Sequence, residues 1–559
     1  MASDEYGRRQ LAPNNLAVEN LGTAVQEWIL PFVTHWISSG VQPLVSREEE
    51  EQLRAFVRAL GGTLPEGYAW LPDLLERLAG AMRFNDHNFV NIHPTPYVPA
   101  IAAAAVVALQ NPNNIVPDVS RATTALEEEA VQWMAELVGF DPRAAWGNVV
   151  SGGTIANLTA LLVARDYTFR KLGRPRPSDL RTRGLYGRTP GVVLASAGSH
   201  YSVKKAAWIL GLGDENVIAI PVAYDEAVKR NAARDAMFLA GITDLEWADR
   251  LHGSVAEDRA RGEKEMDAFY RGTSQPFSLQ PLNSEIFKAM YACFTYSTPL
   301  IAYVFTVGTT DTGTIEAPDA KALQLLATED VFIHADAAAG GFGLVHPRIK
   351  ARATGLARVH SVTLDAHKLG HLSYPNGAVL FRDRGWMYEI MHEAPYLQGL
   401  SPTIEGSRSG CSSAALWAAI QDLGTAGYHA WMGRLLQFMD ALVNALEATD
   451  LFQVLHNVHL TSVAVAPRIS GSTTRREVNQ LVLDVHKRIR EDTSSAAFLV
   501  NVDRGLAGIK VLNAPGTDDE DLVDIFCWRI VAANPAAEPA DAMALVDYLA
   551  RQVATVRRK

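Results

Sequence analysis

Residues 331–370 read VFIHADAAAG GFGLVHPRIK ARATGLARVH SVTLDAHKLG, and this stretch decides how the chain folds. It contains two short apolar runs, VFIHAD and SVTLD, each of which ends in an aspartate. Apolar runs of this length, separated by helical patterns, are typical of strands buried on both faces of a parallel sheet. Asp336 would then end one strand and Lys368 would follow the other, at the sheet edge where open parallel sheets bind ligands.

Similar apolar runs lie on both sides of this stretch, at residues 191–196, 216–222, 301–307 and 377–382. Together they predict an α/β fold, with a mostly parallel central sheet and helices on both faces. We expect this large domain to cover residues 106–390, with a polar, charge-rich insertion at about 223–290. Residues 1–105 would form a helical arm and a segment of the substrate site. Strand and helix patterns alternate in residues 411–559, which predicts a smaller C-terminal α+β domain.

The composition excludes several classes of function. The 559 residues are 48% hydrophobic and 20% charged, as in an ordinary globular protein, and the formal net charge of −11 disfavours nucleic acid or an anionic membrane as a partner. The apolar run at residues 97–109 is shorter than the ~18 residues of a membrane span. Three widely spaced cysteines, Cys293, Cys411 and Cys527, favour neither disulfides nor a metal site, and we expect a cytoplasmic protein.

Four features at predicted strand ends carry chemistry. A partly desolvated lysine at position 368 would lose its proton easily and form a Schiff base with an aldehyde. Asp336 would keep a pyridine nitrogen protonated, and the small residues 337–341 leave room for a flat ligand. The turn of residues 151–154, SGGT, precedes a helix whose free N–H groups would bind phosphate, and the imidazole of His200 would stack on a ring.

Each feature also has an ordinary structural explanation when it is taken alone. Lys368 would be a surface lysine, Asp336 a helix cap, the glycine pair a plain turn, and His200 a helix cap or a core residue whose hydrogen bonds are satisfied. Their combination favours pyridoxal phosphate as the ligand.

Five motifs occur along the chain in a specific order: Ser151-Gly152-Gly153-Thr154, His200-Tyr201-Ser202-Val203, Val307-Gly308-Thr309-Thr310, His334-Ala335-Asp336-Ala337-Ala338 and Asp365-Ala366-His367-Lys368. Over roughly residues 84–415 this order resembles the group II pyridoxal-phosphate-dependent amino-acid decarboxylases. The segments NDHNFVNIHPTPYVP (85–99) and HKLGHLSYPNGA (367–378) are most similar to the bacterial L-tyrosine decarboxylases. Two positions depart from the pattern: Glu316 replaces a frequent aspartate, and Ala335 replaces a frequent valine.

The resemblance implies the PLP-dependent aspartate-aminotransferase-like fold (fold type I) and a role for each motif. Lys368 would hold pyridoxal 5′-phosphate covalently, Asp336 would pair with its ring nitrogen, and His200 and Ala338 would pack on its two faces. The remaining cofactor contacts would be Ser151, Gly152, Gly153, Thr154 and His367 at the phosphate, and Thr310 near the 3-hydroxyl and the substrate carboxylate.

The resemblance further implies a homodimer with the active site at its interface, and a mobile catalytic loop at residues 391–410. Tyr396 in this loop is the candidate proton donor. Residues 84–120 contain no Lys or Arg, which favours an aromatic over an acidic substrate. His93 and Tyr374 would contact its ring or phenol hydroxyl, although Arg121 and Arg408 would reverse this choice if they pointed into the pocket.

We therefore expect a PLP-dependent carboxy-lyase that converts an aromatic L-amino acid, with L-tyrosine giving tyramine and carbon dioxide. Three alternatives stay open. A glutamate or aspartate decarboxylase would act on acidic substrates, and an aromatic aldehyde synthase would release ammonia and peroxide, which Tyr396 disfavours. A catalytically silent dimeric binding protein on the same fold is disfavoured by the presence of Lys368, Asp336 and His200.

Overall fold

The structure is a computed structural model of the chain. It describes residues 15–38, 47–60, 64–65, 68–81, 88–173, 180, 184–185, 190–220, 283–295, 298–318, 320–391, 402–468, 475–492, 499–504, 510–511, 523–524 and 526–558. Most of the predicted insertion at 223–290 therefore lies outside the described residues, as does half of the predicted catalytic loop, including Tyr396.

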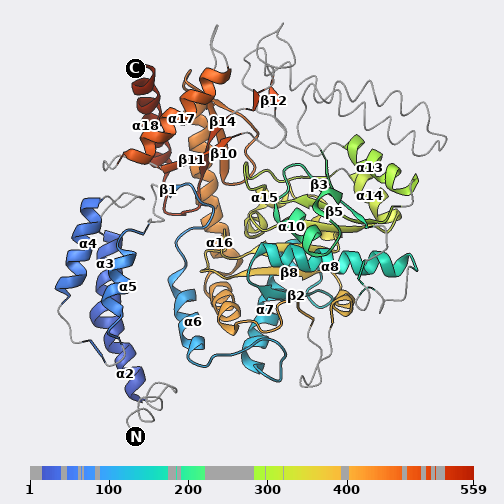
Figure 1. The fold of residues 1–559 in the computed structure, drawn as a ribbon, viewed down its shortest axis with the longest axis horizontal. Helices are drawn as coiled ribbons and strands as arrows, with labels where there is room; N and C mark the ends of the chain where they lie inside the picture. Colours follow the sequence, from blue (N-terminus) through green and yellow to red (C-terminus); the bar gives the residue numbers. More distant parts are fainter. Residues whose placement is uncertain are drawn as a thin grey trace.

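A seven-stranded sheet forms the centre of the molecule, with the strand order β2-β8-β7-β6-β5-β3-β4 (Figure 1). All neighbouring pairs from β7 to β4 are parallel, whereas β8 is antiparallel to both β2 and β7. The strands are β2 (Trp146–Val150), β3 (Val192–Ser196), β4 (Val217–Ile220), β5 (Leu300–Thr306), β6 (Phe332–Ala337), β7 (Ser361–Asp365) and β8 (Gly377–Phe381). The predicted α/β fold with a mostly parallel sheet is confirmed.

Helices cover both faces of this sheet, which is why β3, β5, β6, β7 and β8 are buried along their whole length. Alternate residues of one strand belong to different cores: Tyr303 and Phe305 pack on one face, and Val304 on the other. Helices α8 (Gly153–Lys171) and α10 (Ser202–Ile209) cover the face of Val304. The opposite face is covered mainly by α7 (Arg121–Val138), α13 (Asn283–Thr295), α14 (Ala320–Thr328) and α16 (Gly410–Glu447).

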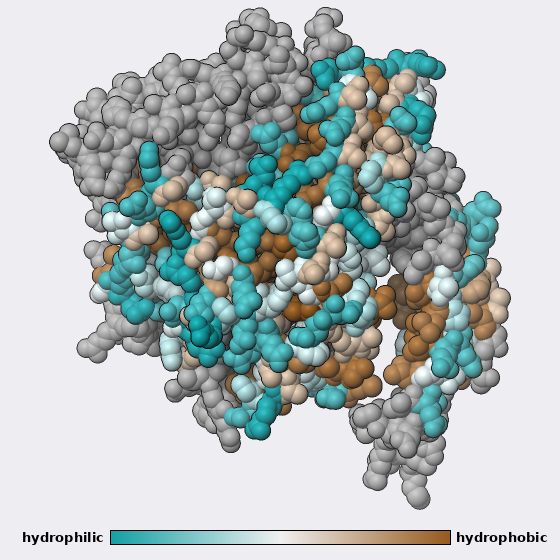
Figure 2. Space-filling view, turned by 180° about the vertical axis from the view of Figure 1, so that it is seen from behind, coloured by the Kyte–Doolittle hydropathy of each residue, from teal (hydrophilic) through white to brown (hydrophobic). Residues whose placement is uncertain are grey.

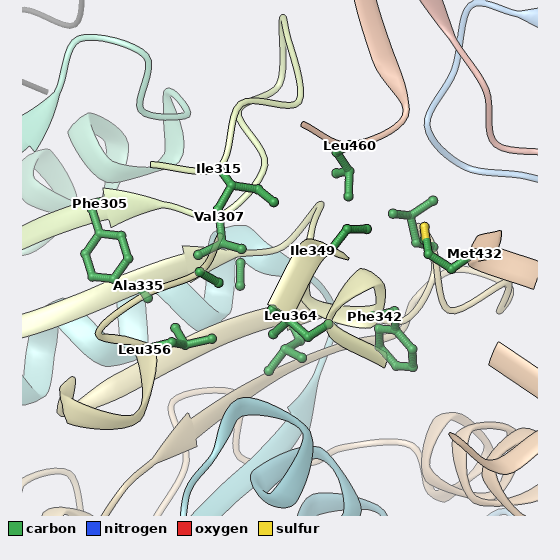
Figure 3. Packing of buried hydrophobic residues seen from close by; sticks show 14 of the residues in the cluster. Phe305, Val307, Ile315, Ala335, Phe342, Ile349, Leu356, Leu364, Met432 and Leu460 are labelled. Atoms are coloured by element: carbon green, nitrogen blue, oxygen red, sulfur yellow. The ribbon is translucent and has the colours of Figure 1, made fainter. Parts of the chain in front are cut away.

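Short helical segments fill the connections before β4 and around β6, β7 and β8. They are η2 (Asp214–Asn216), η3 (Gly341–Val345), α15 (Pro347–Lys350), η4 (Leu356–Arg358) and η5 (Arg384–Glu389). In Figure 3, Leu364 at the end of β7 lies beside Phe342, Ile349 lies between these residues and Val307, and Met432 and Leu460 approach from the C-terminal part of the chain. One continuous core therefore joins the central sheet to the C-terminal region.

The C-terminal region contains a five-stranded sheet with the order β1-β11-β14-β10-β9. Its strands are β1 (Asn88–Phe89), β9 (Phe452–Val454), β10 (Ser462–Pro467), β11 (Leu499–Arg504) and β14 (Phe526–Val531), and it packs with α17 (Arg475–Glu491) and α18 (Pro539–Arg557). A further pair joins β12 (Lys510–Val511) to β13 (Val523–Asp524). β1 pairs with β11 in parallel, so two residues of the segment that precedes α6 form an edge strand of the C-terminal sheet.

The N-terminal helices form an arm beside the rest of the molecule (Figure 1). It consists of α2 (Asn15–Ala24), a π-helix η1 (Val25–Ile29), α3 (Leu30–Ser38), α4 (Arg47–Ala59) and α5 (Leu71–Leu78), with α6 (Val98–Ala108) next to it on the body. The arm has its own small core, in which Trp28, Val57 and Leu75 pack together. Figure 2 shows hydrophobic surface on the arm and on the adjoining part of the body. Among the helices described, none combines the length and apolar character needed to span a bilayer.

Candidate active site

One cavity of about 340 Å³ lies at the carboxyl ends of β6 and β7. The start of α8 and the segment before α10 form its other walls. Its volume lies within the range of small-molecule sites. It is lined by Ser151, Gly152, Gly153, Thr154, Ile155, Asn157, His200, Tyr201, Asp336, Ala338, Asp365, His367, Lys368 and Tyr374. Four of the five motifs thus meet in space, as their positions at predicted strand ends require.

Lys368 lies in the first turn after β7, and its side chain is 19% exposed. Its Nζ is 3.2 Å from Oδ2 of Asp365, which is the last residue of β7 and is buried. The same carboxylate oxygen is 3.4 Å from Nε2 of His367. The lysine is therefore held by a buried negative charge with its amine toward the cavity.

Asp336 lies near the end of β6 and is buried. Its two carboxylate oxygens accept separate hydrogen bonds: Oδ2 from Nδ2 of Asn157 at 2.7 Å and Oδ1 from the N–H of Ala338 at 3.1 Å. Hydrogen bonds that are donated to a carboxylate stabilise its negative charge. Asp336 is thus suited to face a protonated nitrogen in the cavity.

His200 lies in the segment between β3 and α10, and its Nδ1 is 2.8 Å from Oγ of Ser202. Burial lowers the pKa of His200 below its ordinary value, although the nearby negative charge of Asp336 opposes this shift. The imidazole is therefore neutral at neutral pH, and a neutral ring can lie against a flat cationic ligand without repulsion.

The glycine turn fits the phosphate of the cofactor. A Cβ on Gly152 would lie 3.3 Å from Cε1 of His367, and a Cβ on Gly153 would lie 2.9 Å from Oδ2 of Asp365, so larger residues would fill the turn. Nδ1 of His367 is buried and has no hydrogen-bond partner within the described part of the chain, and a phosphate oxygen would satisfy it. The N–H of Ser151 instead donates to both carboxylate oxygens of Glu405 at 3.3 Å.

Tyr374 lines this cavity, and His93 contacts Tyr374 without lining the cavity itself. Their rings meet edge to face at 5.6 Å between centroids, and the Tyr374 ring is 4.0 Å from that of His367. Burial and the positive charge of Lys368 both lower the pKa of His93. Tyr374 thus shares the cavity with Lys368, and His93 lies near enough to feel the charge of the lysine. Their contact with a substrate stays a prediction.

Thr310 is exposed and does not line this cavity. Its carbonyl accepts a hydrogen bond of 3.1 Å from Nη1 of Arg529 on β14, and the same nitrogen is 3.9 Å from Asp311. Burial raises the pKa of Asp311, which Arg529 and His200 oppose by their charges. The loop after β5 therefore places Asp311 between the cavity and a guanidinium of the C-terminal sheet.

The two arginines that would reverse the substrate choice do not line this cavity. Arg408 is buried in an ion pair with Glu127, and it also donates to the carbonyls of Val149 and Asn114 at 2.8 and 2.7 Å. Arg121 and Arg408 instead line a second cavity of about 460 Å³ between α7 and β2. Neither guanidinium is placed to bind a substrate side chain beside Lys368.

Two residues of the site received no role from the sequence. Asp365 was part of a motif, but its contact with Lys368 appears only when the turn after β7 is folded. Asn157 on α8 donates to Asp336, which is 179 positions away in sequence. Its position one turn after the glycine pair, on the helix that starts at the cavity, is a signal that could have identified it.

The family model described as "Pyridoxal-dependent decarboxylase conserved domain" matches residues 78–239 and 285–466. A curated relative, L-2,4-diaminobutyrate decarboxylase of Rhizobium meliloti, is 30% identical over 307 residues, which cover 55% of this chain and 48% of the relative. The probable L-tyrosine/L-aspartate decarboxylase of Methanothermobacter thermautotrophicus is 28% identical over 62% of this chain and 74% of its own length. This chain thus matches about half the length of the first relative.

Among solved structures, the fold is similar to the glutamate decarboxylase domain of the diaminobutyrate-pyruvate transaminase and L-2,4-diaminobutyrate decarboxylase from Vibrio parahaemolyticus. The TM-score is 0.71 at 18% identity, and the match covers 99% of this chain and 100% of the other. At this identity the likeness shows the fold alone. The relatives named above act on different amino acids, so the matches leave the substrate open.

Proposed function

The chain belongs to the pyridoxal-dependent decarboxylase family, and on that premise we propose that it removes the α-carboxyl group of an L-amino acid with pyridoxal 5′-phosphate bound at Lys368. One observation carries this proposal: the amine of Lys368, the carboxylate of Asp336 and the imidazole of His200 line the same cavity as the glycine turn. An amine for the aldehyde, an anion for the ring nitrogen and N–H groups for phosphate are what this cofactor requires.

Each residue has a separate task in this proposal. Bound pyridoxal phosphate supplies an electron-withdrawing ring that accepts the electron pair left behind by carbon dioxide. Asp336 keeps the ring nitrogen protonated, and His200 and Ala338 hold the ring flat. Tyr396, which lies outside the described residues, is our proposed donor of the proton that replaces the carboxyl group. Closure of its loop would exclude water.

We propose an aromatic side chain for the substrate, with L-tyrosine as the expected acid and tyramine as the product. Lys368 is the one Lys or Arg among the described residues that line the cavity, and it is engaged with the cofactor. Arg529 places a positive charge beside Thr310, where the family resemblance locates the α-carboxylate. A second carboxylate would lack a cation, whereas the rings of His93 and Tyr374 can contact an aromatic substrate.

L-2,4-diaminobutyrate is the second candidate, because a carboxylate lies at the glycine turn. Glu405 is half-buried and contacts the N–H of Ser151, which lines the cavity. Such a carboxylate would attract the terminal ammonium group of this substrate. The name of the Rhizobium meliloti relative points to the same class of substrate.

We also propose that the chain forms a homodimer in the cytoplasm. On α6 and just after it, Val98, Ile101, Val106 and Leu109 are 71%, 45%, 63% and 51% exposed. A row of exposed apolar side chains of this kind marks a protein–protein contact in many proteins. Cys293 and Cys411 form no disulfide within the described part of the chain, which favours a reducing compartment.

Measurement of carbon dioxide and amine release from each of the twenty amino acids and from L-2,4-diaminobutyrate tests the proposal. We expect L-tyrosine to give equal amounts of carbon dioxide and tyramine, without ammonia, and Lys368→Ala to give none. Preferred turnover of diaminobutyrate, and its loss in Glu405→Gln, would select the second candidate. Turnover of acidic substrates, release of ammonia with peroxide, or no turnover would instead select the decarboxylase of acidic substrates, the aldehyde synthase or the binding protein.

A further inference from the structure

Asn157 lies at the centre of a buried polar network beneath the cavity. Its side chain is 1% exposed, and it contacts residues from β6, β7 and α10. Nothing in the proposed reaction requires an asparagine to touch the substrate. Four hydrogen bonds nevertheless meet at this one amide, so its role is determined by their directions.

The carboxylate of Asp336 fixes how the amide is oriented. An ionised carboxylate can only accept, so the group 2.7 Å from its Oδ2 must be the NH₂ of Asn157. Oδ1 of Asn157 therefore faces the opposite way, where it accepts from Oγ1 of Thr363 at 2.7 Å and from Nε2 of His334 at 3.0 Å.

His334 is matched to this arrangement. Because its Nε2 donates to Asn157, its Nδ1 is free to accept from Oγ of Ser361 at 2.8 Å. Burial lowers the pKa of His334 to about 4, which keeps the ring neutral at physiological pH. His334 and Thr363 together therefore prevent the amide of Asn157 from flipping.

The second hydrogen of the amide reaches His200. It is donated to Oγ of Ser202 at 2.9 Å, and Ser202 in turn lies 2.8 Å from Nδ1 of His200. Ser202 accepts from Asn157, so its own hydrogen points to His200. Nδ1 of His200 is then an acceptor, and its proton resides on Nε2.

We propose that Asn157 is a positioning residue that fixes two groups at once: the carboxylate of Asp336 for the ring nitrogen of the cofactor, and the tautomer of His200 for the ring face. This inference rests on the proposed function. Asn157 acts through Asp336 and Ser202, and it does not contact the reacting bond.

A comparison of two cofactors tests the first part. 1-Deazapyridoxal phosphate has a carbon in place of the ring nitrogen, so it forms the same bond to Lys368 but does not need Asp336. In the apo-protein, we expect Asn157→Leu to weaken binding of pyridoxal phosphate by about 10- to 100-fold, since a buried charged group loses its donor. Binding of the deaza analogue should change by less than about threefold, because this ring has no nitrogen that needs the charge of Asp336.

Two further variants make this comparison specific. Thr159→Val on the same helix removes a buried hydroxyl that bonds only to Ile155 among the described residues, so it should leave the affinity ratio of the two cofactors unchanged. Thr363→Val removes one support of Oδ1 and should shift the ratio in the direction of Asn157→Leu, by a smaller factor. If Asn157→Leu does not fold, Thr363→Val decides the question. Equal weakening of both cofactors, or an unchanged ratio, overturns the inference.

The second part is tested by the ¹⁵N chemical shifts of His200, assigned from a His200→Gln sample. In the wild type we expect an acceptor-type shift for Nδ1 and an N–H shift for Nε2. Ser202→Ala keeps the backbone N–H that donates to Nδ1 at 3.3 Å, so it should move the Nδ1 shift only part of the way toward the other tautomer. The reverse tautomer in the wild type contradicts the network.

Failure of the wild type to bind pyridoxal phosphate at Lys368 would overturn the proposed function itself. If the wild type binds pyridoxal phosphate but Asn157→Leu has the same ratio of affinities for the two cofactors as the wild type, only the inference about Asn157 is overturned.

Discussion

At the scale of single residues, Glu316 is a buried carboxyl group that titrates near neutrality. Burial raises its pKa to about 7, against the hydrogen bonds that it accepts from Ser196 and from the N–H of Thr306 at 2.7 Å. Its contacts join β3 to β5, close to Asp336. This buried carboxyl group therefore links the stability of the fold to pH.

We expect the neutral variant Glu316→Gln to change how stability depends on pH. The folded state binds the proton more tightly than the unfolded state, so this group's contribution falls as pH rises from 4.5 to about 7. At about 1.4 kcal/mol per pH unit, the full effect is of the order of 3 kcal/mol. In urea denaturation, the unfolding free energy of Glu316→Gln relative to that of the wild type should therefore rise across this pH range. A constant difference at all pH values would contradict the assignment.

The distance along the chain between a residue and its contacts decided whether the sequence could predict its role. Asp336 and Lys368 were predictable because the end of an apolar strand is visible locally and parallel strands end at the same edge. Asn157 was not, since its partners Asp336 and Thr363 are 179 and 206 positions away. Only the folded sheet brings these strands beneath α8.

At the scale of elements, the strands were predictable because burial on both faces leaves continuous apolar runs. The long helical pattern after residue 410 also corresponds to one element, α16, but Gly424 interrupts it with φ 55° and ψ −167°. This bend was not predicted, because nothing in the neighbouring sequence breaks the helical period. Beyond the bend, Tyr428 donates from its hydroxyl to the carbonyl of Gly370 at 3.0 Å, two residues after Lys368.

The bend at Gly424 gives a prediction with a matched control. Positive φ with this ψ is available to glycine but strained for alanine, so Gly424→Ala should cost about 1–3 kcal/mol of unfolding free energy. Gly433 lies in the helical part of α16, and a Cβ added there would meet no described atom within 4 Å, so Gly433→Ala should stabilise by about 0.5–1 kcal/mol. Chemical denaturation measures both. Equal effects of the two substitutions would show that Gly424 is not required for the bend.

The pairing of β1 with β11 also lay beyond prediction. β1 has two residues and joins a strand more than four hundred positions away, and neither partner carries a local signal of the other. The sequence therefore contains no sign that the chain before the proline-rich segment pairs with a strand of the C-terminal sheet.

At the scale of the whole molecule, five buried histidines make stability depend on pH. Burial lowers the pKa of His334, His360, His456 and His459 to about 4 and that of His371 to about 3. His334 lies in β6, and the other four lie in the connections next to β7 and between β9 and β10. Folding thus keeps five imidazoles neutral that an unfolded chain would protonate near pH 6.5.

We therefore expect the protein to unfold on mild acidification. Between pH 6.5 and 4 the unfolded state binds more protons than the folded state, so stability falls as pH falls. Each group contributes up to about 3 kcal/mol, and their sum reaches the ~5–15 kcal/mol that stabilises an ordinary domain. Thermal unfolding followed by circular dichroism should show the midpoint dropping steadily below pH 6.5. An unchanged midpoint from pH 7.5 to 4.5 would rule out this account of the histidines.

The site as a whole joins parts that are distant along the chain. The glycine turn at the start of α8 and the ends of β6 and β7 surround the region where the cofactor would bind.

The central claim is that the amine of Lys368 bonds covalently to pyridoxal phosphate. The most direct measurement is borohydride reduction of the cofactor-loaded protein, followed by protease digestion and mass spectrometry. We predict one phosphopyridoxyl group per chain, on the peptide that contains Lys368, and no such label in Lys368→Ala. A label on another lysine, or equal labelling of Lys368→Ala, would contradict the account.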